Sequence, residues 1–385
     1  MASSNGNHLL VFGASGVSGW ACVKEALSNP SKSTFDKVTG LTNRPLSLEE
    51  SKLPQDSRLQ LVSGIDLTGS VEDVVASMKQ KIDGIETVTH VIFTAYIERP
   101  DYESLRAVNT DLLRTAISAV DQLAPKLQTV VLQTGGKAYG VEFKDKVEYN
   151  PPLKESAPRI PEPYYDKVFY YHQYDALKEL SASRPWTFSE IRPDVIVGFT
   201  PGTNFMNCAQ GLGLWLSLAR EVHGAGAQIS FPGTEASWNA KATDTFQDIL
   251  GKMNIYAAVN HDKCGNGESF NCADGSVASW ADKWPGICSW FGLEGTPPGE
   301  NPYSAEEFVK EHRDTWRKLE EEHRLKEGII DNFSWRFLYA ITAMCDFDRQ
   351  YDLSKARSVG FEETLDTVKG YTTSFERMRE GKIIP

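Results

Sequence analysis

Residues 8–27 read HLLVFGASGVSGWACVKEAL, and this stretch decides the fold. Its first apolar run predicts a buried strand, and the residues from about Val17 onward predict a helix. Between them, Gly13, Gly16 and Gly19 form a GxxGxxG pattern that suits a dinucleotide. The first glycine permits the sharp exit from the strand, the second lets backbone amides approach a pyrophosphate, and the third allows close helix–strand packing. A glycine-rich turn without a ligand is the alternative interpretation.

The helix after this turn would present free N–H groups and the positive end of its dipole to phosphates. Its place at the first strand–helix junction of an α/β chain favours the cofactor interpretation. We expect the cofactor to lie against the carboxyl ends of the strands. The expected cofactor-binding residues are Gly13, Ser15, Gly16, Val17, Gly19, Asn43, Arg44, Asp66, Leu67, Thr94, Ala95, Thr134, Gly135 and Val195.

Strands and helices alternate through the first half of the chain. The expected strands cover residues 37–41, 59–65, 88–95, 129–134 and 186–197, the last broken by Arg192-Pro193, and the expected helices cover 71–81, 105–123 and a segment beginning near Asp166. This rhythm predicts an α/β fold with a Rossmann-type, doubly wound parallel sheet. The proline-rich segment 149–165 is expected to be irregular.

The second half of the chain lacks this rhythm. Helical spacing recurs over residues 209–221, 243–259, 276–291 and 304–324. We therefore predict that residues 1–200 are mainly the dinucleotide-binding domain. Residues 201–385 are predicted to form mainly a smaller, helical substrate-binding lobe, with some segments returning to the core.

Composition restricts the class of protein. The 385 residues are 41% hydrophobic and 24% charged, with a net charge of −12, which argues against nucleic acid or an anionic membrane as a partner. No apolar run approaches the roughly 20 residues of a transmembrane helix, and the first residues lack a signal-peptide pattern. The six cysteines form no CxxC pair and the seven histidines no HxxxH pair, so we expect no metal and no disulfide framework. A reduced, cytoplasmic protein fits these features.

The end of the second expected strand bears on the choice of cofactor. Chains that bind NAD usually place a carboxylate there for the ribose 2′-hydroxyl, whereas this chain has Thr42-Asn43-Arg44-Pro45. Arg44 is available to hold a 2′-phosphate, which favours NADPH. A solvated loop arginine is the alternative. Asp66, at the end of the third strand, could reach the adenine amino group.

Two tyrosine patterns lie on the helix that begins near Asp166. Short-chain dehydrogenases use a tyrosine hydroxyl as proton donor or acceptor, and a lysine four residues later lowers its pKa. Tyr174 with Lys178 fits this YxxxK spacing. Tyr171 has Asp175 at the lysine position and does not fit.

Several motifs, taken together and in order, resemble the progesterone 5β-reductase/iridoid synthase-like reductases. GASGVSG is similar to that family's GxTGxxG, FYYHQYD to its FYYxxxD and TGGKAY to its TGxKxY. Further matching segments are TNRP (42–45), THVIFTAY (89–96), PRIP (158–161), RPDVIVGFTP (192–201), FPG (231–233) and FNCADG (270–275). The resemblance covers nearly the whole chain. It departs from the family at Asn43, where an arginine is usual, and at Tyr96, where a tryptophan is usual.

The resemblance implies a function and a catalytic pair. Tyr171 would be the catalytic tyrosine and Lys137, from TGGK, its partner, so that Tyr174 and Lys178 become ordinary helix residues. The reaction would be the NADPH-dependent reduction of an activated C=C bond, in a 1,4-enone or enal, of a small apolar, natural-product-like substrate. Tyr171 would stabilise the enolate oxygen.

Two other functions stay open from the sequence. The first is a carbonyl reductase or alcohol dehydrogenase on the same scaffold, in which the same pair protonates an alkoxide. The second is a non-redox enzyme or regulator that keeps NADP as a ligand, although such a protein would need neither Tyr171 nor Lys137. Partners are expected to be a small-molecule substrate and, as an option, a second copy in a homodimer.

Residues 332–347, NFSWRFLYAITAMCDF, are expected to form a helix. Phe333, Phe337, Ala340, Ile341 and Met344 recur at helical spacing and predict an apolar stripe wider than a surface helix needs. Core packing alone explains such a stripe. The family resemblance places this helix along the substrate cleft. The expected substrate-pocket residues are therefore Tyr96, Trp335, Phe337 and Met344.

Overall fold

A computed structural model describes residues 6–300 and 304–385 and divides the chain into two compact units. Unit 1 contains the residues up to Asp194, then Asp248–Cys272 and Asp352–Glu362. Unit 2 contains Val195–Gln247, Ala273–Tyr351 and Glu363–Pro385. The chain therefore leaves unit 1 three times and returns to it twice.

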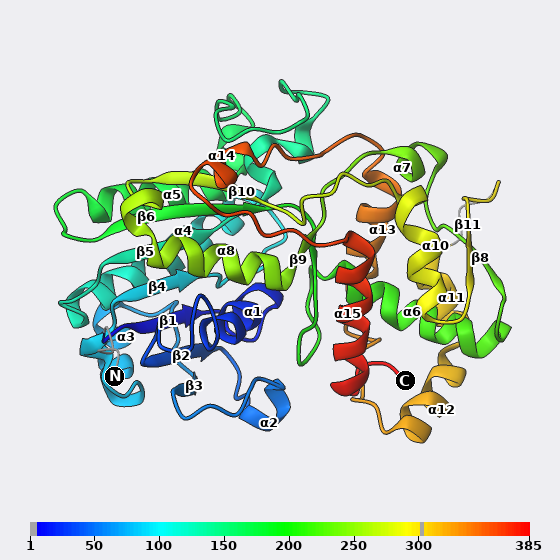
Figure 1. The fold of residues 1–385 in the computed structure, drawn as a ribbon, viewed down its shortest axis with the longest axis horizontal. Coiled ribbons are helices and arrows are strands. Elements are labelled where there is room, and N and C mark those ends of the chain that lie inside the picture. The colour runs from blue at the N-terminus through cyan, green and yellow to red at the C-terminus, as the bar shows by residue number, and fades with distance from the viewer. Residues whose placement is uncertain (1–5, 301–303) are drawn as a thin grey trace. The chain divides into compact units, whose positions relative to one another are not determined.

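Unit 1 is built on a seven-stranded parallel sheet with the order β10-β6-β5-β4-β1-β2-β3 (Figure 1). The strand order reverses between β1 and β4, which makes this the switch point where ligands of such sheets bind. The predicted Rossmann-type parallel sheet is confirmed. The strands are β1 (His8–Phe12), β2 (Lys37–Thr42), β3 (Leu59–Ser63), β4 (His90–Phe93), β5 (Thr129–Gln133), β6 (Thr187–Pro193) and β10 (Glu268–Cys272).

Helices cover both faces of this sheet. On one face, α3, α4 and α5 bury their apolar residues against β1, β4 and β5 in one continuous core. On the other face, α8 packs so closely on α1 that a Cβ on Gly251 would lie 2.8 Å from the carbonyl oxygen of Ala21. The helices of unit 1 are α1 (Val17–Ala26), α2 (Leu48–Ser51), α3 (Val71–Lys81), α4 (Tyr102–Leu123), α5 (Phe169–Ser181), α8 (Gln247–Val259), α9 (His261–Cys264) and α14 (Ser354–Ser358).

Two strands differ from the sequence prediction. The seventh strand, β10, was not predicted, because its segment is short and polar and reaches the sheet edge only after the chain returns from unit 2. The strand predicted over 186–197 ends at Pro193, and Ile196–Val197 instead forms β7, which pairs with β9 (Thr245–Phe246) in unit 2. Proline lacks the N–H that would continue the ladder.

Unit 2 is mainly helical, with two small parallel pairs of strands, β7 with β9 and β8 with β11. Its core contains the stacked indoles of Trp215 and Trp284, whose centroids lie 5.7 Å apart. The helix predicted over 304–324 is two helices that meet at His312, and the one predicted over 243–259 begins at Gln247 because the preceding residues belong to β9. The remaining elements are α6 (Cys208–His223), β8 (Gln228–Ser230), α7 (Glu235–Asn239), α10 (Trp280–Trp290), β11 (Glu294–Thr296), α11 (Ala305–Glu311), α12 (Arg313–His323) and α15 (Thr367–Glu380).

The segment 332–347 is helical but not a regular α-helix. α13 (Trp335–Tyr339) continues into a π-helical turn, Ala340–Met344, closed by a bond from the Cys345 N–H to the Ala340 carbonyl. The wider turn changes the angular phase of the residues that follow it. The predicted apolar stripe is therefore wrong in its later part, since Met344 is 61% exposed.

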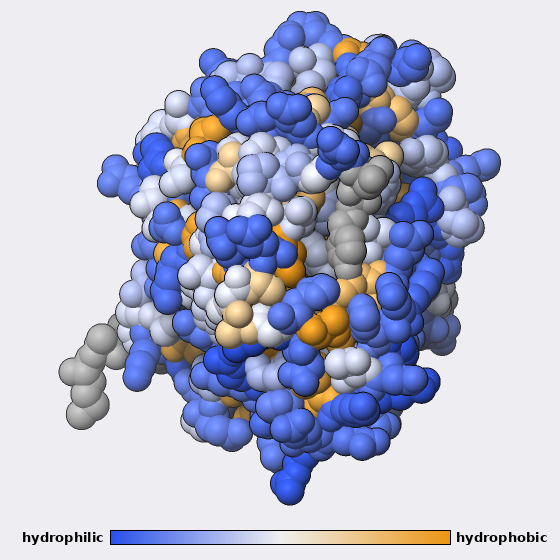
Figure 2. Space-filling model, turned by 90° about the vertical axis from the view of Figure 1, so that its right-hand side faces the viewer, coloured by the Kyte–Doolittle hydropathy of each residue, from blue (hydrophilic) through white to orange (hydrophobic). Residues whose placement is uncertain are grey.

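The surface shown in Figure 2 is mostly hydrophilic, and its apolar residues form small, separate groups. In residues 6–300 and 304–385 there is no helix with the length and apolar character needed to cross a membrane.

Candidate active site

The turn between β1 and α1 requires its glycines. Gly13 has a φ of +83°, and a Cβ on it would lie 2.8 Å from Oγ1 of Thr94. A Cβ on Gly19 would lie 2.2 Å from the Gly13 carbonyl oxygen, so α1 can approach β1 only with glycine here. Gly16 is the N-cap residue of α1, and neither a side-chain cap nor an acidic residue occupies the first turn. The open amides of α1, next to exposed Ser15 and buried Val17, fit a pyrophosphate.

The carboxyl ends of β2 and β3 carry the residues predicted to contact adenosine. Asn43 and Arg44 are both exposed, and the Thr42 hydroxyl donates to the Arg44 carbonyl oxygen at 2.7 Å. Asp66 is exposed and accepts hydrogen bonds from the backbone N–H and the hydroxyl of Thr68. The neighbouring Leu67 is half-buried. This edge thus offers one cation and no carboxylate directly after β2.

At the end of β4, Thr94 and Ala95 lie beside the glycine turn. The Thr94 hydroxyl donates to the Phe12 carbonyl oxygen at 2.7 Å and so links β4 to β1. Tyr96 is half-buried, and its hydroxyl donates to the Glu98 carboxylate. Burial, followed by the bond to Glu98, raises the pKa of Tyr96. Tyr96 is therefore a neutral aromatic residue shortly after the carboxyl end of β4.

Tyr171, on the first turn of α5, is 3% exposed. Its hydroxyl donates to the Ala138 carbonyl oxygen at 2.6 Å and accepts from the Ile160 N–H at 3.1 Å. Burial raises the pKa of Tyr171, although the Ile160 bond and the nearby Arg192 and Arg159 oppose this rise. The proton of this tyrosine is thus held by a backbone carbonyl just beyond the carboxyl end of β5.

Lys137 precedes Ala138 in a 3₁₀ turn, Gly136–Tyr139, that follows β5. Its ammonium pairs with the Glu142 carboxylate at 3.0 Å, and about a third of each side chain is exposed. The link from Lys137 to Tyr171 runs through the backbone of Ala138, since neither a hydrogen bond nor an ion pair joins the two side chains in the described chain.

The alternative pair, Tyr174 with Lys178, lies elsewhere on α5. The Tyr174 hydroxyl donates to the Gly267 carbonyl oxygen at 2.7 Å, just before β10 begins. In a parallel sheet this is the amino edge, opposite the edge where ligands bind. Lys178 is exposed.

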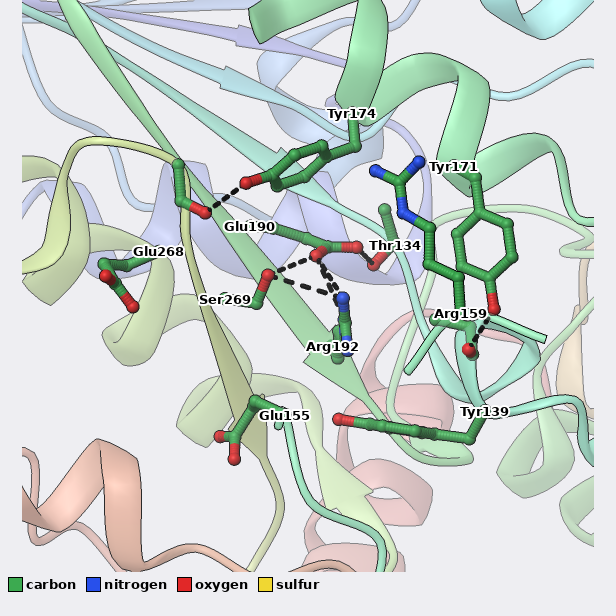
Figure 3. A network of polar contacts seen from close by, with 12 residues as sticks. Thr134, Tyr139, Glu155, Arg159, Tyr171, Tyr174, Glu190, Arg192, Glu268 and Ser269 are labelled. Carbon is green, nitrogen blue, oxygen red and sulfur yellow. Dashed lines mark hydrogen bonds and ion pairs between the residues drawn. The ribbon is translucent and has the colours of Figure 1, made fainter. Parts of the chain in front are cut away.

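A buried polar network behind Thr134 was missed by the sequence analysis. Glu190, on β6 and 2% exposed, accepts hydrogen bonds from the hydroxyls of Thr134 and Ser269 and from the Arg192 guanidinium (Figure 3). Burial disfavours the charged carboxylate, but Arg192 and these bonds outweigh it and keep the Glu190 pKa below its ordinary value. Glu190 and Arg192 are two residues apart on a strand and share one face, which is the signal that could have revealed the network. Thr134 and the buried Gly135 are thereby held in place.

The other predicted site residues belong to unit 2. The carbonyl oxygen of half-buried Val195 accepts from the Thr245 N–H at 2.9 Å. Trp335 is half-buried, and its indole N–H donates to the Ile330 carbonyl oxygen at 3.3 Å. Phe337 is half-buried and Met344 is exposed. A substrate role for these residues stays a prediction.

Comparison with known proteins identifies the family. The family described as the PRISE-like Rossmann-fold domain matches residues 9–385. The chain belongs to this family. The short chain dehydrogenase sirQ of Leptosphaeria maculans is 38% identical over 98% of this chain and 97% of its own. The 3-oxo-Delta(4,5)-steroid 5-beta-reductase of Arabidopsis thaliana is 27% identical over 91% of this chain and 86% of its own.

Among solved structures, Gre2 from Candida albicans in complex with NADPH is similar in fold, with a TM-score of 0.63, 13% identity and coverage of 97% of this chain and 99% of that one. The protein is thus an oxidoreductase of the short-chain dehydrogenase/reductase superfamily, with the extended Rossmann architecture. Enzymes of this superfamily act on small molecules with a nicotinamide dinucleotide.

Proposed function

We propose that this PRISE-like enzyme uses NADPH to reduce the activated C=C bond of a 1,4-enone or enal in a small apolar, natural-product-like substrate. The observation that carries the proposal is the buried Tyr171 hydroxyl, held by the Ala138 carbonyl at the carboxyl end of β5. The name of the Arabidopsis relative, a 5β-reductase of 3-oxo-Δ4,5-steroids, supports an enone as the substrate class.

The choice of NADPH rests on the end of β2. Arg44 is exposed there, and the nearest carboxylates that follow it in the sequence are Glu49 and Glu50. A guanidinium can form charged hydrogen bonds to a 2′-phosphate, whereas a 2′-hydroxyl offers it little. The glycine turn would hold the pyrophosphate, and the Thr134–Gly135 segment would support the nicotinamide end.

Tyr171 would act on the carbonyl oxygen of the substrate. When bound, NADPH supplies a hydride to the β-carbon of the C=C bond. Negative charge then develops on the carbonyl oxygen, and the Tyr171 hydroxyl would move its hydrogen bond from Ala138 to that oxygen. Lys137, next to Ala138 in the chain, would add positive potential to the same region.

Tyr96, Trp335, Phe337 and Met344 are the residues proposed to contact an apolar substrate. The raised pKa keeps the Tyr96 hydroxyl neutral, and the other three side chains carry no charge. None of them would therefore bring a competing charge to the reacting carbonyl.

The test is a screen of NADPH oxidation over small enones, enals and ketones, with the products identified. We expect saturated aldehydes or ketones as products, and faster turnover with NADPH than with NADH. Alcohol products with the C=C bond intact would instead establish a carbonyl reductase. Tight NADPH binding without turnover of any substrate would point to the non-redox alternative.

A further inference from the structure

Asp175 occupies the position, four residues after Tyr171, at which short-chain dehydrogenases of the YxxxK type carry a lysine. A carboxylate there would oppose the development of negative charge on the tyrosine. In the structure this carboxylate is paired with Arg159, whose two terminal nitrogens donate to its two oxygens, each at 2.7 Å. The Arg159 pKa is raised, mainly by its bonds to Asp175. Asp175 therefore anchors a cation at this position.

The anchored guanidinium lies against the catalytic candidate. The Arg159 guanidinium carbon is 5.0 Å from the centre of the Tyr171 ring and 5.2 Å from that of Tyr174, and Figure 3 shows it between the two rings. Its third contact is the Tyr165 hydroxyl, which accepts from Arg159 at 2.9 Å and donates to Asp175 at 3.2 Å. The guanidinium is thus fixed on three sides.

The residue after Arg159 contacts the hydroxyl itself. The Ile160 N–H donates to the Tyr171 oxygen at 3.1 Å. One short loop segment, residues 159–160, therefore supplies a cation beside the ring and a hydrogen-bond donor to its oxygen. Both interactions favour the anionic form of a tyrosine.

The other charged groups near Tyr171 differ from Arg159 in the contacts that they make. Arg192 also favours the anionic form of Tyr171, but it is bonded to the buried Glu190 at 2.8 Å, and the Glu190 charge raises the pKa of Tyr171. Lys137 pairs with Glu142. Arg159 is paired as well, but it is the cation in contact with the face of the Tyr171 ring.

We propose that Arg159, clamped by Asp175, is the positioning residue of Tyr171 and supplies the positive charge that the lysine of a YxxxK pair would supply. The pair holds the 159–160 segment so that Ile160 can donate to the tyrosine oxygen. It also stabilises that oxygen as its proton shifts toward a substrate carbonyl. This inference rests on the proposed role of Tyr171.

The test compares Arg159→Gln with the wild type and with Arg159→Lys. The matched control is Arg114→Gln, which removes another arginine–carboxylate pair, Arg114 on α4 with Glu179 on α5, and leaves the contacts of Tyr171 intact. The protein is labelled with tyrosine carrying ¹³C at the ring carbon that bears the hydroxyl, and Tyr171→Phe assigns the Tyr171 resonance among the 14 tyrosines.

In Arg159→Gln the alkaline onset of the Tyr171 titration should move to higher pH by about one unit, which corresponds to about a tenfold change in the ionisation equilibrium. kcat should fall about tenfold or more, with KM changed less than about twofold. Arg159→Lys should restore part of both effects, and Arg114→Gln should change neither.

An unchanged Tyr171 resonance and onset in Arg159→Gln would overturn the inference, and so would an equal loss of kcat in Arg159→Gln and Arg114→Gln. If thermal melting shows that Arg159→Gln does not fold, Asp175→Asn carries the test, because it keeps the arginine but removes its anchor. Its Tyr171 resonance must then shift, and no shift overturns the inference. The resonance needs no turnover, so failure to find an enone substrate would count against the proposed function alone.

Discussion

At the scale of single residues, the hydroxyl of Tyr171 is the group on which the chemistry would depend. Tyr171→Phe keeps the ring and its packing but removes the proton that would meet the substrate oxygen. We expect kcat to fall on the order of 10²–10³-fold, as for the loss of one hydrogen-bond donor to a developing oxyanion. Steady-state kinetics with an accepted enone measures this. Tyr174→Phe is the matched control and should be mild, because its hydroxyl bonds to Gly267 at the amino edge. If Tyr174→Phe were inactive and Tyr171→Phe active, Tyr174 would be the catalytic tyrosine instead.

Arg44 is the residue on which the choice of NADPH depends. Arg44→Ala should weaken NADPH binding by roughly tenfold or more, since a charged hydrogen bond is worth about 1.5–3 kcal/mol. The proposed bond from Arg44 to the 2′-phosphate would be exposed to solvent. NADH binding should hardly change. Titration calorimetry with both cofactors checks this, with Arg99→Ala, another exposed loop arginine of unit 1, as the control. Equal affinity of the wild type for the two cofactors would contradict the prediction.

At the scale of elements, α13 and its π-turn combine buried and accessible residues. Leu338 and Ile341 are buried, whereas Phe337 is half-buried and Met344 is 61% exposed. Single π-turns inside helices often occur at functional sites, where they change the direction of side chains. We therefore propose that α13 and its π-turn select substrates and do not bind the cofactor.

Replacing Phe337 or Met344 with alanine should change the ratio of kcat/KM for a bulky enone to that for a short one, and leave NADPH affinity unchanged. Leu338→Ala is the control, because a buried leucine should cost about 2–5 kcal/mol of stability and change both substrates alike. The measurement is kcat/KM for both substrates, with thermal stability followed in parallel. If every variant loses stability and changes kcat/KM by the same factor for both substrates, the segment has only a packing role.

At the scale of the whole molecule, the buried carboxyl group of Asp274 in unit 2 is expected to make stability depend on pH. Asp274 is fully buried, with one carboxylate oxygen accepting from the Phe246 N–H. Burial, together with the nearby Asp244 carboxylate, raises the pKa of Asp274 to about 8, although the Phe246 bond and Lys283 oppose this. Asp244 itself is paired with Lys283 at 2.6 Å. The folded protein therefore keeps a proton on Asp274 at neutral pH.

The pH dependence of stability follows from this raised pKa. An aspartate in the unfolded chain has a pKa of about 3.9, so between about pH 4 and pH 8 the folded state binds one proton more than the unfolded state. The free energy of unfolding should therefore fall as pH rises through this range. Asp274→Asn, which cannot ionise, should lose less stability from pH 5 to pH 8. Thermal melting across this range measures it, with the exposed Asp314→Asn as the control. If melting temperature changed with pH in the same way for the wild type and Asp274→Asn, the titration of Asp274 would not be the cause.

The sequence by itself determined the features that depend on neighbours along the chain. The glycines of the β1–α1 turn, the alternation of strands and helices and the motifs that resemble the family were all readable, and the fold and the family are confirmed. These features are local, because glycine spacing and apolar periodicity act within a few turns or strands. The pairing of Tyr171 with Lys137 stays a prediction, taken from the resemblance.

Only the tertiary structure decided which distant residues meet. It placed β10 at the sheet edge, joined Glu190 to Thr134 and Ser269, and set Arg159 against Asp175 and Tyr171. Each of these contacts joins separate segments, so it depends on where the chain returns in space, and for Glu190 also on the need of a buried charge for partners. Local propensity contains neither piece of information. It likewise did not reveal the π-turn, which differs from an α-helix by one extra residue in a single turn.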